Sequence, residues 1–158
     1  MAYHLRALIA ERDTLSGLAK RLPGAHVAAL DGALGLLPLT DELLKGLPAD
    51  GKKPFASLDV LPAVGDAARA ASAKGPVAFI TAAYDTGKDY QAAVVWTGGK
   101  VALGPLIDET AWDPREPAAL RERPVNSALR LLGVDAGEFD DEWDAVGMAR
   151  HRDTADWK

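Results

Sequence analysis

Three apolar runs joined by short turn sequences in the second half of the chain constrain the fold most strongly. Residues 76–84 and 90–96 have the length and apolar content of strands, and residues 101–107 follow after Thr97-Gly98-Gly99-Lys100. Two adjacent glycines can both adopt the positive φ that the tightest hairpin turns require. We therefore predict that the three runs form an antiparallel meander, with residues 85–89 as a loop between its first two strands.

The first half of the chain carries weaker strand signals and several helix signals. Residues 3–9 alternate as a strand does, and residues 26–30 and 34–39 flank Asp31-Gly32 as a second hairpin would. Three helices are predicted in this half: one capped by Asp13 or Thr14, one capped by Thr40, and one over residues 62–74.

The last part of the chain carries two further helix signals. Val125, Ala128, Leu129 and Leu132 repeat at helical spacing, and Phe139, Trp143 and Val146 give a final helix one apolar stripe. Since hairpins outnumber plausible parallel crossovers, we predict an α+β protein with a mostly antiparallel sheet. The sheet consists of two hairpin or meander units covered by helices on one face. Residues 1–158 form one domain, with 48–57 and 108–123 as exposed loops.

Composition excludes several classes of protein. Cysteine is absent, so disulfides and thiol chemistry are excluded, and hydrophobic residues make up 48% of the chain, as in a globular domain. A net charge of −5 with no basic stripe argues against nucleic-acid binding. Arg6 interrupts the N-terminal apolar run, and no run reaches the ~20 apolar residues that span a bilayer. We therefore expect a cytoplasmic protein without membrane contact.

Residues 138–157 contain seven acids and two arginines, a net charge of −5 that equals the charge of the whole chain. Helix electrostatics explains the order of these charges, with acids first and bases last, but not the acidic surplus. Trp143 and Trp157 lie in the same segment. Charge mixed with large aromatic side chains is typical of a partner-binding surface. The predicted binding residues are Asp140, Asp141, Glu142, Trp143, Asp144, Arg150, Arg152, Gln91 and Trp112.

An enzyme is the alternative interpretation of the same region. Asp144 and His151 are seven positions apart, so they share one face if the last helix persists, and they could form a general-base pair. Together with Gln91 and Arg150 they would build a hydrolase or small-molecule site between the meander and the last helix.

Other catalytic and metal patterns are incomplete. Asp85-Thr86-Gly87 resembles an aspartic-protease signature, but Lys88 stands where a small residue is needed. The acidic run after Asp135 lacks the ligand spacing of a calcium loop, and the three histidines are scattered. We predict no metal site and no cofactor.

Several short motifs resemble a group of small single-domain bacterial proteins of the GC-rich, actinobacterial type. They are Thr40-Asp41-Glu42-Leu43, residues 91–96, Asn126-Ser127-Ala128-Leu129, Leu132-Gly133-Val134, Asp141-Glu142-Trp143-Asp144, and Arg150-His151-Arg152 with Trp157. In size and acidity such proteins are similar to immunity proteins, which neutralise toxins. The resemblance implies a non-enzymatic, immunity-like or regulatory protein that binds a protein partner, and a homo-oligomer remains an alternative.

Overall fold

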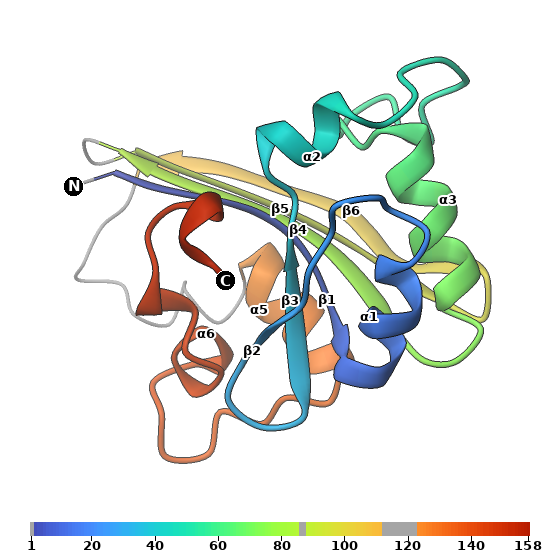
Figure 1. The fold of residues 1–158 in the computed structure, drawn as a ribbon. Helices are drawn as coiled ribbons and strands as arrows, with labels where there is room; N and C mark the ends of the chain where they lie inside the picture. Colours follow the sequence, from blue (N-terminus) through green and yellow to red (C-terminus); the bar gives the residue numbers. More distant parts are fainter. Residues whose placement is uncertain (1, 86–87, 112–122) are drawn as a thin grey trace.

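The centre of the protein is a six-stranded sheet with the strand order β2-β3-β1-β4-β5-β6 (Figure 1). The computed structural model describes residues 2–85, 88–111 and 123–158. Each pair of neighbouring strands is antiparallel, which together with the helices confirms the α+β class. The strands are β1 (Tyr3–Glu11), β2 (Ala28–Ala29), β3 (Leu34–Pro38), β4 (Val77–Asp85), β5 (Lys88–Thr97) and β6 (Lys100–Ala111).

The helices follow the predicted order along the chain. They are α1 (Arg12–Ala19), α2 (Asp41–Lys45), α3 (Pro62–Ala71), α5 (Pro124–Leu131) and α6 (Glu142–Ala145), with short 3-10 helices η1 (Met148–Arg150) and η2 (Thr154–Asp156). The predicted cap of α2 is confirmed, because Thr40 Oγ1 accepts a hydrogen bond from Leu43 N at 3.1 Å. The predicted cap of α1 is wrong, because the N-cap position is Glu11, two residues before Asp13 and three before Thr14.

The meander β4-β5-β6 forms as its turn residues predict. Gly98 and Gly99 have φ values of 60° and 81°, the combination that a tight hairpin turn requires. Ser72 holds this turn, since its carbonyl accepts from Gly98 N and its hydroxyl accepts from Gly99 N, both at 2.9 Å.

The predicted loops beside the meander are shorter than expected. β5 begins at Lys88, so Asp89 belongs to a strand rather than to a loop over residues 85–89. β6 continues to Ala111, so residues 108–111 are strand rather than loop, and Arg123 at the other end is buried. Trp112 and the rest of 112–122 lie outside the described residues. Residues 48–57 form no helix or strand, and all but Phe55 are exposed.

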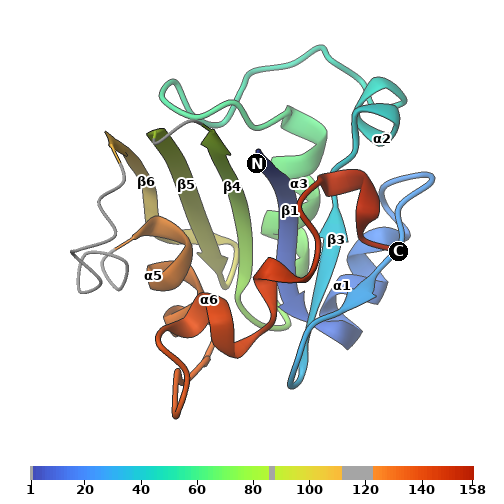
Figure 2. The same ribbon diagram turned by 90° about the vertical axis from the view of Figure 1, so that its left-hand side faces the viewer.

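Helices cover both faces of the sheet, not one face as predicted (Figure 2). Leu8, Phe79 and Val94 pack with α1, α2 and α3 in one apolar cluster. Ile9, Ile80 and Val95, which are the next residues on the same three strands, pack with α5 and the C-terminal segment in a second cluster. The alternation of the pleat thus sends neighbouring residues into two separate cores.

The C-terminal segment completes the pairing of β1. β3 pairs with β1 only from Ala7 to Glu11. Towards the N-terminus of β1, His4 N instead donates to Arg152 O at 2.7 Å, and Arg6 N donates to Thr154 Oγ1 at 3.1 Å. Trp157 is buried in the core, so the C-terminal segment packs against the rest of the protein.

The last helix is shorter than the sequence pattern predicts. α6 ends at Ala145, and Gly147 adopts a φ of 81°, which an α-helix does not continue. Phe139 precedes α6 and is exposed, so it does not belong to the predicted apolar stripe. Across the described ranges, no helix has both the length and the apolar character that crossing a membrane requires.

Candidate functional site

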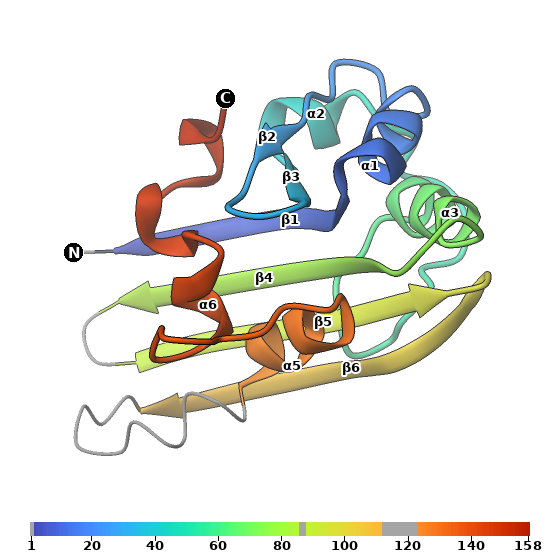
Figure 3. The same cartoon turned by 90° about the horizontal axis from the view of Figure 1, so that it is seen from below.

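α5 and α6 lie over β4 and β5 (Figure 3). A cluster of buried polar side chains joins these elements. On β5, Asp89 accepts a hydrogen bond from Arg123, the residue before α5. Gln91 Oε1 accepts from Val125 N at 3.1 Å, and its amide nitrogen donates to the Tyr84 hydroxyl. The first turn of α5 is thus attached to the sheet through two side chains of β5. Gln91 has a structural role and no access to a partner.

Asn126 joins α5 to α6. Its Nδ2 donates to Asp141 Oδ2 at 3.1 Å, and its Oδ1 accepts from Trp143 N at 2.9 Å. Asp141 also caps α6, because its Oδ1 accepts from Asp144 N at 2.9 Å. The buried Glu142 lies 3.7 Å from Arg130 on α5. Asp141 and Glu142, predicted as binding residues, therefore serve the packing of α6 on α5.

Three aromatic rings from distant parts of the chain meet beside this cluster. Trp143 lies with its ring centroid 5.2 Å from Tyr3 and 5.8 Å from Tyr84, and the two tyrosine rings are 5.4 Å apart. Burial raises the pKa of Tyr84 to about 12, which the hydrogen bond from Gln91 and the charge of Arg123 oppose. Trp143 is half-buried and anchors α6 rather than standing free on the surface.

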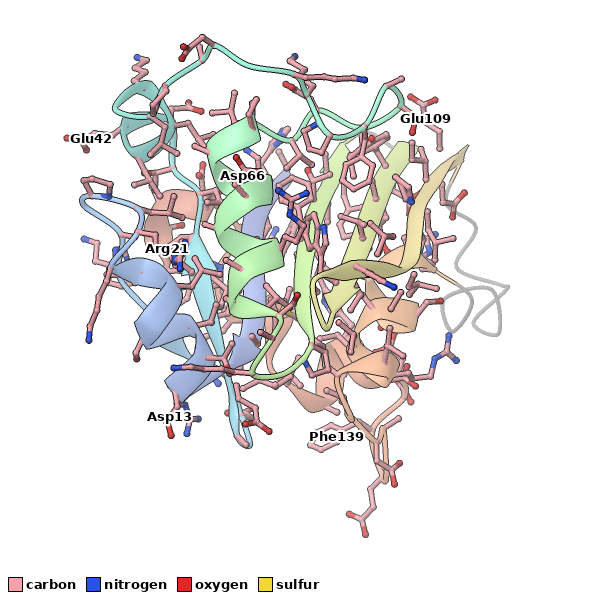
Figure 4. All side chains as sticks on the ribbon, turned by 90° about the vertical axis from the view of Figure 1, so that its right-hand side faces the viewer. Asp13, Arg21, Glu42, Asp66, Glu109 and Phe139 are labelled. Atoms are coloured by element: carbon pink, nitrogen blue, oxygen red, sulfur yellow. The ribbon has the colours of Figure 1, made fainter. Side chains whose placement is uncertain are left out.

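Four exposed acids of the C-terminal region lie in or beside the connection between α5 and α6. We call this surface the acidic loop, and it consists of Leu131, Asp135, Glu138, Phe139, Asp140 and Asp144. Its two apolar side chains are exposed, Phe139 at 56% and Leu131 at 43%. Partial burial raises the pKa of Asp144, and the nearby Asp141 and Asp140 raise it further. Figure 4 places Phe139 on a projecting loop, at the opposite end of the molecule from Glu42.

The other predicted site residues do not join this surface. The Arg150 side chain contacts the β2-β3 hairpin. Its Nη2 lies 2.7 Å from Asp31 Oδ1, and its Nη1 donates to Ala29 O at 3.2 Å. The exposed Arg152 contributes its carbonyl to β1. The His151 ring packs edge-on against Trp157 at 4.8 Å.

The structure removes the geometric basis of the alternative catalytic site. Because the helix ends at Ala145, Asp144 and His151 do not share a helical face. Gln91 is buried under α5, and Arg150 is held by Asp31. None of these four residues lines the three cavities that Arg6 borders. Within the described ranges, no three His, Asp or Glu side chains are grouped so that they could hold a metal ion.

Sequence reasoning missed the residues that organise this region. Asp89 and Arg123 are 34 positions apart, and each lay in a segment that we predicted as a loop. The sequence pattern that could have indicated Asn126 is its position between Val125 and Ala128 on the apolar face of α5, where an amide needs buried partners.

Comparison with known proteins yields no relative: no family model, no curated protein and no solved structure matches this chain. The resemblance to small actinobacterial proteins therefore stays a prediction.

Proposed function

We propose that this chain is a non-enzymatic, immunity-like or regulatory protein that binds a basic protein partner through its acidic loop. The observation that carries the proposal is the exposed Phe139 between the exposed acids Glu138 and Asp140. An aromatic side chain in water gains free energy when it enters an apolar pocket. Like charges on both neighbouring residues favour a partner of opposite charge and steer its approach.

The acidic loop favours a different partner over a second copy of the chain. Asp135, Glu138, Asp140 and Asp144 are all exposed, and two copies of this surface would repel each other. The same repulsion disfavours nucleic acid. The proposal places the complex in the cytoplasm and requires no cofactor.

A capture experiment with matched variants tests the proposal. Immobilised protein is incubated with lysate at about 50 mM and about 500 mM salt, a range over which the Debye length falls severalfold. The test variant is E138Q/F139S/D140N. The control variant D13N/D66N/I107S makes the same charge change and also replaces one exposed apolar residue, but on α1, α3 and β6.

The proposal is supported if one protein binds to wild type and to the control variant at low salt. The same protein should not bind at high salt, and it should not bind to the test variant. The captured protein, once purified, should lose its own activity when the wild-type chain is added. A test variant that captures the same proteins as wild type would exclude the acidic loop as the binding surface.

A further inference from the structure

Three adjoining cavities lie on the face of the sheet that carries α1, α2 and α3, away from the acidic loop. Their volumes are about 810, 240 and 160 Å³. Arg6 is a lining residue of all three. We call the combined space the Arg6 groove.

The groove forms where β3 leaves β1. The last contact is the hydrogen bond from Leu39 N to Arg6 O at 2.9 Å, after which the chain turns into α2. The segment from α2 to α3 then passes over the ends of the central strands (Figure 4). Thr154 and Ala155 of the C-terminal segment also line the groove.

The Arg6 guanidinium can form more hydrogen bonds than the described residues provide. Its side chain is 36% exposed, and its Nη2 lies 3.2 Å from Oδ1 of Asp41, which is itself 84% exposed. Within the described part of the chain, Nε and Nη1 of Arg6 have no hydrogen-bond partner. A single contact to so exposed an acid is weak, whereas the planar guanidinium can bind a carboxylate through two parallel hydrogen bonds.

An apolar recess opens beside this cation. The smallest cavity is lined by Arg6, by Asp59 and by the apolar side chains of Leu39, Leu44, Leu61, Val64 and Phe79. Its 160 Å³ corresponds to about five groups the size of a water molecule, at ~30 Å³ each. Apolar space next to one cation is suited to a ligand with a short hydrocarbon chain and an anionic head.

The charges around the groove limit that anionic head to one charge. Asp59 Oδ1 lies 2.9 Å from Lys53 Nζ, so this acid already has a counter-ion. The largest cavity contains the acids Asp41, Glu42 and Asp153 alongside Arg6 and Lys158. A dianion such as a phosphate ester would be repelled by these acids more strongly than a monocarboxylate.

We propose that the Arg6 groove binds a monocarboxylate with an unbranched chain of about six carbons. The carboxylate takes the place of Asp41 on the Arg6 guanidinium, and the chain enters the recess between Leu44 and Phe79. This site is independent of the acidic loop, which lies on the other side of the sheet.

A titration of the isotope-labelled chain with hexanoate, followed by amide NMR shifts, tests the proposal. Hexanoate should shift the amides of Arg6, Leu44 and Val64, while hexan-1-ol and hexylamine should bind at least tenfold more weakly. R6M keeps the aliphatic stem and should weaken hexanoate binding about ten- to hundredfold, as expected for lost charge-assisted hydrogen bonds. L44F should block the recess and abolish binding.

D41N gives the sharpest test, because it removes the group that competes with the ligand for Arg6. It should tighten hexanoate binding about two- to fivefold, the range that an exposed ion pair represents. R69M and D66N are matched controls, since Arg69 and Asp66 form an exposed pair at 3.0 Å on α3, and both should bind as wild type does. Binding of hexan-1-ol within twofold of hexanoate, or hexanoate affinity unchanged in both D41N and L44F, would overturn the proposal. So would shifts spread over both faces of the protein.

Discussion

Arg123 donates a hydrogen bond from Nη1 to Oδ2 of Asp89, and the two side chains are only 7% and 4% exposed. The pair joins the residue before α5 to the second position of β5. It therefore fixes the start of α5 against β5. A buried pair of this kind is sensitive to the loss of one partner, since the remaining charge is largely shielded from solvent.

We predict that D89N destabilises the protein by about 3–5 kcal/mol, because it leaves Arg123 as an uncompensated buried charge. D66N, which breaks the exposed pair with Arg69, should cost less than about 1 kcal/mol. The double variant D89L/R123M should recover most of the loss, since it removes both charges. Urea unfolding of the three variants measures these differences, and equal effects of D89N and D66N would contradict the structural role of the buried pair.

A second prediction concerns the link between α5 and α6. N126A removes the partners of Asp141 Oδ2 and of Trp143 N, and we expect it to cost about 2–3 kcal/mol. S127A changes the next residue of the same helix, which is half-buried and accepts a hydrogen bond from Arg130 at 3.2 Å. It should cost less than about 0.5 kcal/mol. The amide signals of α6 should broaden in N126A alone, and sharp α6 signals in that variant would argue against the link.

Gly104 gives a third prediction. Its φ is 88°, and an added Cβ would lie 2.6 Å from Ala93 O and 2.7 Å from Leu106 N, both backbone atoms. G104A should therefore destabilise the protein by more than about 2 kcal/mol, from backbone strain and from the clash together. Gly98 is the matched control, with a φ of 60° but open space around its Cβ position. G98A should cost about 1–2 kcal/mol, from strain alone. Thermal unfolding of both variants separates the two contributions.

The fourth prediction is a loss of stability at high pH. Burial raises the pKa of Tyr84 from 10.0 to about 12, so the folded state holds this proton more tightly than the unfolded state. The stabilisation is fully present below pH 10 and is lost as the pH rises to about 12. At ~1.4 kcal/mol per pH unit, Tyr84 accounts for a loss of about 2–3 kcal/mol.

Comparison with Y84F isolates this contribution. The variant should lose less stability than wild type between pH 10 and pH 12, although Tyr3, whose pKa burial also raises, retains its own pH dependence. Urea unfolding at several pH values gives the two slopes. Parallel slopes would show that Tyr84 ionises in the folded state as it does in the unfolded chain.

Local signals predicted the order of the elements, because each signal acts within a few residues. The Gly98-Gly99 turn, the Thr40 cap and the alternation of β1 need no distant partner to be recognised. The sequence also indicates that both faces of the sheet are covered, although we predicted helices on one face. Residues 92–96 are continuously apolar and all buried, and such a run indicates a strand enclosed on both sides.

The candidate sites were predictable only in part, since they depend on contacts between distant segments. Phe139 has the right spacing for a helical stripe, and its exposure follows only from where α6 begins. The partner of Arg123 lies 34 positions away, and no local pattern marks it. The Arg6 groove combines residues of β1, α2, β4 and the C-terminal segment, which become neighbours only after the sheet has formed.

The contact between Arg6 and Thr154 spans 148 positions of the chain, so it has a kinetic consequence. A hairpin such as β5-β6 closes quickly, whereas a contact across almost the whole chain is penalised by loop-closure entropy until the intervening sheet has formed. The first residues of β1 should therefore remain an unprotected strand edge late in folding. During that interval this edge, rather than the acidic loop, is where two chains would associate wrongly.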